Sequence, residues 1–171
     1  MHYHNISKDD MLNGDGLRVV LWTAGCDHQC RGCHNPVTWN PDDGLLFNAA
    51  AKQEIFEQLA KPYTAGITFS GGDPLHKNNR IEVQFLMKEI KDRYPDKTIW
   101  FYTGSIWENI KNLPMLKYID VLVDREFDAD KKDSNLLWKG SSNQRVIDVQ
   151  ATLKQNNPDI PVLYCSDHDD T

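Results

Sequence analysis

Short apolar runs of strand length recur along the chain. They occupy residues 17–23, 67–70, 98–102, 119–123, 145–149 and 162–164. Runs of this length, rich in branched and aromatic side chains, are typical of strands buried in a sheet. The pattern therefore predicts six strands.

Three of the intervening segments have the periodicity of amphipathic helices. Asn48 is a suitable N-cap for a first helix. Ser105 and Glu108 have the spacing of a capping box that opens a third helix with Ile106, Ile110 and Leu113 turned inward. The apolar positions expected to face the core are Ala51, Ile55 and Leu59 in the first helix and Val83, Leu86, Met87 and Ile90 in the second.

Alternation of strand and helix indicates βαβ crossovers, and hence an α/β fold with a mainly parallel sheet and alternating helices. About six strands are too few for a closed eight-unit barrel of about 250 residues. We therefore expect a partial, open βα barrel. A length of 171 residues suits one domain over residues 1–171, and we expect the Asp-rich tail from about residue 156 to be poorly ordered.

Unusual residues follow four of the predicted strands. A cysteine-rich loop follows the first, Gly71–Pro74 the second and Thr103-Gly104 the third, while Asp124 ends the fourth. The carboxyl ends of parallel strands meet at one edge of a sheet, where α/β proteins bind ligands. The four segments are therefore expected to form one site.

The charge balance argues against broad polyanion binding. Lys and Arg number 19 against 25 Asp and Glu, a net charge of −6. Such a balance leaves no basic field for nucleic acid or an anionic membrane. The sequence also lacks an apolar run of about 18 residues and the features of a signal peptide. We expect a soluble, cytoplasmic protein.

Three of the four cysteines, Cys26, Cys30 and Cys33, lie within GCDHQCRGCHNP, too close together for a disulfide framework. This group of three cysteines has three interpretations. It binds zinc with His28 or His34 as fourth ligand, it binds nothing, or it holds an iron–sulfur cluster with one iron left free of protein ligands. The remaining Cys165 is expected to be a free thiol.

The spacing CxxxCxxC after a first strand resembles the signature of radical S-adenosylmethionine enzymes. Together with the cysteine loop, the segments NGDGLR (13–18), SGGDPL (70–75) and GSSNQR (140–145) resemble the activating proteins of anaerobic ribonucleoside-triphosphate reductase, a family of glycyl-radical-enzyme activases. The resemblance covers residues 3–148. Arg125 stands where the family often has Gly, so we expect that turn to differ. Lys139 stands where Arg is expected.

This resemblance implies a [4Fe-4S] cluster on Cys26, Cys30 and Cys33, with S-adenosylmethionine completing the fourth iron. One electron would cleave the sulfonium, and the 5′-deoxyadenosyl radical would take a hydrogen atom from a glycine in the C-terminal region of the reductase. The electron donor expected for the family is a flavodoxin. The cofactor carries the difficult chemistry, so an acid–base pair is not needed.

The resemblance also implies which residues contact S-adenosylmethionine. Gly71, Gly72 and Asp73 would receive its methionine end, with a side chain at Gly72 filling the cofactor's space. Gly32, Cys33 and His34 would contact it from the cluster side, and Tyr102 and Asp124 are candidates for the adenosine pocket.

Other residues receive structural interpretations. His2, His4 and His28 are expected at the surface. Residues 141–145 precede a strand, so the strand-end argument does not place them in the pocket, and their side chains are expected to bond locally in a turn.

Three alternatives remain at this point. The substrate of the radical chemistry is another glycyl radical enzyme or a small molecule, or the chain is a zinc-stabilised adaptor without catalytic activity. An incomplete barrel leaves an open side, which suits a peptide better than an enclosed metabolite.

Overall fold

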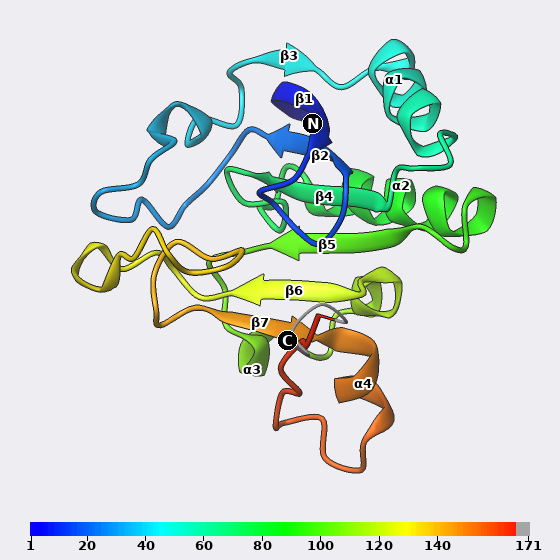
Figure 1. Cartoon of the computed structure of the whole chain (residues 1–171). Coiled ribbons are helices and arrows are strands. Elements are labelled where there is room, and N and C mark those ends of the chain that lie inside the picture. The colour runs from blue at the N-terminus through cyan, green and yellow to red at the C-terminus, as the bar shows by residue number, and fades with distance from the viewer. Residues whose placement is uncertain (167–171) are drawn as a thin grey trace.

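The computed structural model describes residues 1–166, which form one seven-stranded sheet in the order β3-β1-β2-β4-β5-β6-β7 (Figure 1). The strands are β1 (His2–Asp10), β2 (Arg18–Thr23), β3 (Leu45–Leu46), β4 (Gly66–Gly71), β5 (Thr98–Tyr102), β6 (Val121–Asp124) and β7 (Arg145–Asp148). The α-helices are α1 (Ala49–Leu59), α2 (Arg80–Arg93), α3 (Trp107–Ile110) and α4 (Val149–Lys154). Within residues 1–166, no helix has the length and apolar character needed to cross a bilayer.

The sheet is mixed, and this corrects the expected barrel. Strands β2, β4, β5 and β6 are parallel, whereas β1 is antiparallel to β2 and β3, and β7 is antiparallel to β6. Between β5 and β6 the chain forms only the four-residue α3 and the 3-10 helix Pro114–Tyr118. The protein is α/β, but the expected mainly parallel, helix-alternating open barrel is wrong.

Two strands were not expected from the sequence, and one expected strand is reduced. Strand β1 reads HYHNISKDD, in which only Tyr3 and Ile6 are buried, so it lacks an apolar run. Strand β3 has two exposed residues. Residues 162–164 contribute one isolated bridge, between Ile147 and Leu163. The last five residues of the Asp-rich tail, 167–171, lie outside the described part of the chain.

Two helices confirm the expected patterns. The Asn48 side chain accepts a hydrogen bond from the Ala51 N–H at 3.0 Å and caps α1. The predicted inward positions of α1 and α2 are all buried: Ala51, Ile55, Leu59, Val83, Leu86, Met87 and Ile90.

The predicted capping box before α3 is wrong. The helix begins at Trp107, and its N–H donates 2.9 Å to the Asp124 carboxylate, which lies at the end of β6. Trp107 is buried, whereas Ile106 is 37% exposed. A distant acidic side chain therefore caps this helix in place of Ser105.

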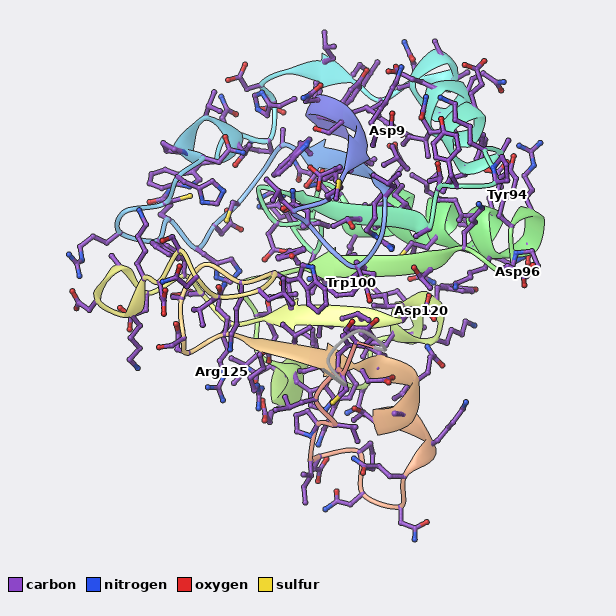
Figure 2. All side chains as sticks on the ribbon, viewed as in Figure 1. Asp9, Tyr94, Asp96, Trp100, Asp120 and Arg125 are labelled. Atoms are coloured by element: carbon purple, nitrogen blue, oxygen red, sulfur yellow. The ribbon has the colours of Figure 1, made fainter. Side chains whose placement is uncertain are left out.

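The two faces of the sheet are covered differently. Alternate residues such as Leu21, Phe69 and Phe101 belong to the main hydrophobic core, which also contains the buried faces of α1 and α2. The opposite face, here called the loop-covered face, carries Arg18 and Trp100, both 1% exposed. Figure 2 labels Trp100. Here the Trp100 ring meets Trp138 at 4.9 Å and Tyr164 at 5.2 Å between centroids. Aromatic side chains from connecting segments thus cover this face of the sheet.

Candidate functional site

The four segments singled out in the sequence lie at one edge of the sheet, as predicted. Strands β2, β4, β5 and β6 all end there, on the left in Figure 1. A cavity of about 130 Å³ opens at this edge. This cysteine cavity is lined by Cys26, Cys30, Cys33, Gly71, Gly72 and Tyr102, among others.

The cysteine loop is closed by its own backbone. The Gly25 N–H donates to the Thr38 carbonyl at 2.7 Å, and the Cys26 N–H donates to the Trp39 carbonyl at 3.0 Å. The Cys33 sulfur accepts from the Asn35 N–H at 3.4 Å. These bonds hold the loop so that its three free, half-buried thiols line the same cavity.

The chemistry of the thiols suits a cluster better than a single ion. Burial raises the pKa of Cys26 and of Cys30, so these thiols release protons when they bind metal. Among residues 1–166, no three His, Cys, Asp or Glu side chains converge as a single metal ion requires. Zinc needs four ligands around one point, whereas the thiolates of an iron–sulfur cluster bind different irons. Three thiols from one loop that line the same cavity therefore match the donor set of an iron–sulfur cluster.

The Asp73 carboxylate connects the loops at this edge. Asp73 is 3% exposed, and one of its oxygens accepts hydrogen bonds from the Thr103 hydroxyl at 2.9 Å and the Gly104 N–H at 3.2 Å. The same oxygen lies 2.8 Å from His28 Nε2. The other accepts from the Leu75 N–H at 2.9 Å. Asp73 thus fastens the cysteine loop to the ends of β4 and β5.

His28 is a bridge, which corrects its expected place at the surface. Its ring nitrogens lie 2.8 Å from Asp73 and 2.8 Å from Glu126, and its side chain is 23% exposed. The hydrogen bond to Asp73, followed by that to Glu126, raises the pKa of His28 to about 9. The imidazolium therefore joins two acidic side chains across the mouth of the site. Because Glu126 is distant in sequence, spacing gave no signal for this bridge.

Gly71 and Gly72 allow the backbone of β4 to approach the cysteine loop. Gly71 has a φ of 102°, which glycine adopts most readily. A Cβ at Gly72 would collide with the carbonyl oxygens of Gly25 and Thr38. The space beside Gly72 is therefore filled by the loop's own backbone, which corrects the expectation that a side chain there would fill the cofactor's space.

The remaining predicted cofactor residues divide into two groups. His34 and Tyr102 line the cysteine cavity, and the Tyr102 hydroxyl donates to the Trp138 carbonyl at 2.6 Å. Gly32 instead packs against the loop after β6, where an added Cβ would lie 3.2 Å from the Ala129 side chain.

Asp124 is fully buried and is engaged elsewhere. Its carboxylate lies 2.6 Å from Arg145 Nη2 and accepts from the Trp107 N–H. Neither Asp73 nor Asp124 is among the described residues that line the cysteine cavity. Both carboxylates are placed to hold the surrounding loops.

Gln144 lies in the cavity wall, although residues 141–145 precede a strand and were therefore not placed in the pocket. The reason is that β7 is antiparallel to β6, so the residues before β7 lie at the same edge as the carboxyl ends of the parallel strands. Gln144 Oε1 accepts from the N–H groups of Gly140 and Ser141, at 2.9 and 3.2 Å. Its Nε2 donates to the Arg125 carbonyl at 3.1 Å. The local bonding was predicted, but the bond across to Arg125 was not.

Arg125 keeps the left-handed turn that a glycine would favour, contrary to expectation. Its φ is 77°, and it directly follows β6. The Arg125 N–H donates to the Ser105 carbonyl at 3.0 Å, and its guanidinium donates to the Asn143 carbonyl at 3.2 Å. Bonds to both neighbouring segments therefore offset the steric cost of this conformation. Within the segment before β7, the Lys139 ammonium donates to the Gln144 carbonyl at 3.1 Å.

Comparison with known proteins agrees with the character of the site. The family model for the 4Fe-4S single cluster domain matches residues 12–147. The chain is 44% identical over 146 residues to the anaerobic ribonucleoside-triphosphate reductase-activating protein of enterobacteria phage T4, covering 85% of this chain and 93% of that protein. The protein of the same name from Escherichia coli K12 is 39% identical over 150 residues, covering 85% and 97%. That from Pasteurella multocida is 38% identical over 150 residues, covering 84% and 95%.

Proposed function

This chain belongs to the family of anaerobic ribonucleoside-triphosphate reductase-activating proteins with a single 4Fe-4S cluster, and we propose that it installs a glycyl radical on that reductase. The observation that carries the proposal is the group of three free thiols that line one cavity with Gly71 and Gly72. A cluster held by three thiolates leaves one iron open to a cofactor. The activity is that of an oxidoreductase.

When bound, the cluster and S-adenosylmethionine would supply the chemistry, namely reductive cleavage of the sulfonium and abstraction of a hydrogen atom from the glycine. The chain supplies the site in which this occurs. In our proposal, Cys26, Cys30 and Cys33 bind three irons. The glycine backbone at 71–72 and the side chains of His34 and Tyr102 surround the cofactor.

The other predicted residues act at one remove. We assign Asp73 the positioning of the cysteine loop, because its carboxylate is occupied by four partners from three segments. Asp124 positions α3 and Arg145, and Gly32 allows the cysteine loop to pack against the loop after β6. None of these three contacts the cofactor in the proposal.

The proposal includes a setting. Low-potential electrons would come from a flavodoxin, and the protein would work in the cytoplasm, where clustered thiols stay reduced. Its partner is the reductase, at the glycine-bearing C-terminal region.

The decisive experiment is anaerobic. The protein is reconstituted with iron and sulfide and then incubated with reductant, S-adenosylmethionine and the purified reductase of its own organism. We expect a glycyl-radical EPR doublet on the reductase, and methionine and 5′-deoxyadenosine in solution. A reconstituted protein that binds zinc but no iron would show that the adaptor interpretation is right. Cleavage of S-adenosylmethionine with no radical on the reductase would indicate a different substrate.

A further inference from the structure

The connection between β4 and α2 contacts the cysteine loop with three of its side chains. These are Asp73, His76 and Asn79, spaced three residues apart, and all three are buried. Their contacts fall within residues 24–28, at the start of the cysteine loop. The sequence indicated a role for Gly71–Pro74 only, so the contacts of His76 and Asn79 extend the site along the chain.

Asn79 is the most deeply buried of the three, with an exposed fraction of 0%. Its Nδ2 group donates to the Ala24 carbonyl at 2.8 Å and to the Asp73 carbonyl at 3.3 Å. Ala24 lies two residues before Cys26, and Asp73 directly follows Gly71 and Gly72. One amide group therefore joins the two backbone segments that contribute cysteines and glycines to the cysteine cavity.

The Asn79 side chain does not cap the helix that follows it. Asn79 occupies the N-cap position of α2, where an asparagine oxygen usually accepts from a backbone N–H of the first turn, but it makes no such bond. Its Oδ1 is buried and has no hydrogen-bond partner among residues 1–166. An unpaired buried acceptor is costly. The orientation of this amide therefore serves the two loops rather than the helix.

Backbone bonds connect the same two segments just past the ends of β2 and β4. The Gly72 N–H donates to the Thr23 carbonyl at 2.8 Å, and the Asp73 N–H donates to the Gly25 carbonyl at 2.7 Å. Gly25 has a φ of 110°, and an added Cβ there would lie 3.1 Å from the His76 ring. Beyond these two bonds, the described link between the segments comes from side chains.

We propose that Asn79 is a positioning residue for the cofactor site, a proposal that rests on the function proposed above. Neither Asn79 nor His76 lines the cysteine cavity, so Asn79 acts through the backbone of Ala24 and Asp73. It sets the start of the cysteine loop against the glycine backbone at 71–72 before a cluster is bound. Without it, the thiols would still be present, but the glycine backbone would no longer be held at a fixed position relative to them.

The other contact of this connection with an ionic character is weaker. His76 Nε2 lies 3.3 Å from the Asp27 carboxylate, whose side chain is 81% exposed. An ion pair or hydrogen bond with a partner this exposed to solvent contributes little. The buried amide of Asn79 is therefore the contact to test.

The first test uses the cluster-free protein. Asn79→Asp keeps the size of the side chain and replaces its donor with an acceptor, and because Asp is also a good N-cap residue, α2 is not weakened. Asn78→Asp makes the same chemical change at the neighbouring, exposed residue. The rate at which each thiol reacts with an aromatic disulfide reagent is measured, with mass spectrometry assigning the cysteines.

We expect the loop cysteines Cys26, Cys30 and Cys33 to react about tenfold faster in Asn79→Asp, because the loop opens more often once a buried bond is lost. Cys165 is exposed and serves as the internal reference. Its rate should be unchanged in every variant, and Asn78→Asp should react as the wild type does.

The second test uses protein reconstituted anaerobically with iron and sulfide. In Asn79→Asp, iron per chain should equal that of the wild type, while equilibrium dialysis should show affinity for S-adenosylmethionine about tenfold weaker. The change that S-adenosylmethionine causes in the EPR spectrum of the reduced cluster should be smaller. Asn79→Ala removes the amide without adding a charge, and gives the same readouts if the Asp variant does not fold.

Thr152→Val is the control for a general loss of stability. Thr152 is fully buried in α4, and its hydroxyl donates to the Asp148 carbonyl at 2.6 Å and accepts from the Val162 N–H at 2.9 Å. This variant should unfold at a lower urea concentration and keep both its thiol rates and its affinity for S-adenosylmethionine.

Three results would overturn the assignment of Asn79: loop thiols that react no faster in its variants, an unchanged affinity for S-adenosylmethionine, or the same losses in Thr152→Val. Failure of the wild-type reconstituted protein to bind S-adenosylmethionine would instead count against the proposed function. The thiol rates of the cluster-free protein do not depend on that function, so the two failures are separable.

Discussion

At the residue scale, chemistry read from the sequence locates the site but not every role within it. The three loop cysteines line one cavity as spacing predicted, whereas Asp73 and Asp124 are used to hold loops. A carboxylate after a strand looks the same in sequence whether it faces a ligand or a neighbouring N–H. The bridging role of His28 was not predicted, because its partners come from segments far away along the chain.

The role of each cysteine can be separated by single substitution. Cys26→Ala, Cys30→Ala and Cys33→Ala should each abolish cluster assembly, because every thiolate supplies one iron ligand. Cys165→Ala is the control, since this thiol is exposed and outside the cavity. Iron per chain and the charge-transfer absorption of reconstituted protein measure the effect. Loss of the cluster in the Cys165 variant, with retention in a loop variant, would refute the three-thiolate site.

Asp73→Asn should loosen the cysteine loop. The substitution removes the charge that faces His28 and leaves part of the network of four partners unsatisfied. We expect the free energy of unfolding of the cluster-free protein to fall by about 1–3 kcal/mol and iron retention after gel filtration to fall with it. The control is Asp27→Asn, whose side chain is 81% exposed and pairs with His76 at 3.3 Å. Equal iron retention in the two variants would show that the Asp73 contacts do not hold the loop.

Glu108 gives a pH-dependent contribution to stability. Both its oxygens bond Arg145, at 3.0 and 2.8 Å, and Arg145 lowers the pKa of Glu108 to about 2, with a smaller contribution from Arg125. Because the folded pKa lies below the unfolded value, the stabilisation is complete above about pH 4.3 and is lost as the pH falls through 2. Glu108 is 42% exposed, so solvent screening limits the contribution to about 0.5–1 kcal/mol.

Urea unfolding of Glu108→Gln and of the wild type at pH 6.5 and pH 3 measures this contribution. The difference between them should be present at pH 6.5 and smaller at pH 3. Glu54→Gln serves as control, because its partner Lys8 is 45% exposed and the pair is more weakly held. A Glu108 difference that grows toward low pH would contradict the assignment.

At the element scale, the sequence predicts what local patterns encode. The cap and buried face of α1 and the stripe of α2 agree with the structure because an amphipathic helix carries its own periodicity. Strand β1 was not predicted, because only two of its nine mostly polar residues are buried apolar ones. The direction of β7 was also not predicted, because side chains alternate in the same way in parallel and antiparallel strands.

The direction of β7 leads to a prediction about Gln144. Gln144→Ala removes bonds to Gly140, Ser141 and Arg125, and should lower the free energy of unfolding by about 1–2 kcal/mol. Because Gln144 lines the cavity, it should also weaken S-adenosylmethionine binding to the reconstituted protein severalfold, as measured by equilibrium dialysis.

Gln150→Ala is the matched control for Gln144→Ala. Gln150 lies just beyond the other end of β7 and donates to the Ile119 carbonyl at 2.7 Å and the Lys117 carbonyl at 3.2 Å. It should lose similar stability and keep its S-adenosylmethionine affinity. If both variants bind the cofactor equally, Gln144 has only a structural role.

At the scale of the whole molecule, the expected open βα barrel is wrong because it depends on connections that the sequence does not specify. A barrel needs a helix after each strand to lay the next strand parallel. In the connection from β5 to β6 the α-helix, α3, is only four residues long, and β7 runs antiparallel to β6. The loop-covered face is instead packed by side chains of Trp138 and Tyr164, contributed by segments that are far from β5 along the chain.

Tyr164 is the contact through which the last described segment helps to close that face. Its ring lies 5.2 Å from Trp100 and 5.7 Å from Trp138, and its hydroxyl donates to the Asp15 carboxylate at 2.9 Å. Tyr164→Phe keeps the ring and removes that bond, so it should cost about 1 kcal/mol of unfolding free energy. Tyr164→Ala also removes the ring packing and should cost about 2–4 kcal/mol. Urea unfolding followed by circular dichroism measures both losses of stability. Tyr63→Ala is the surface control, because Tyr63 is 55% exposed. If Tyr164→Ala unfolds at the same urea concentration as Tyr63→Ala, the chain end does not hold the loop-covered face together.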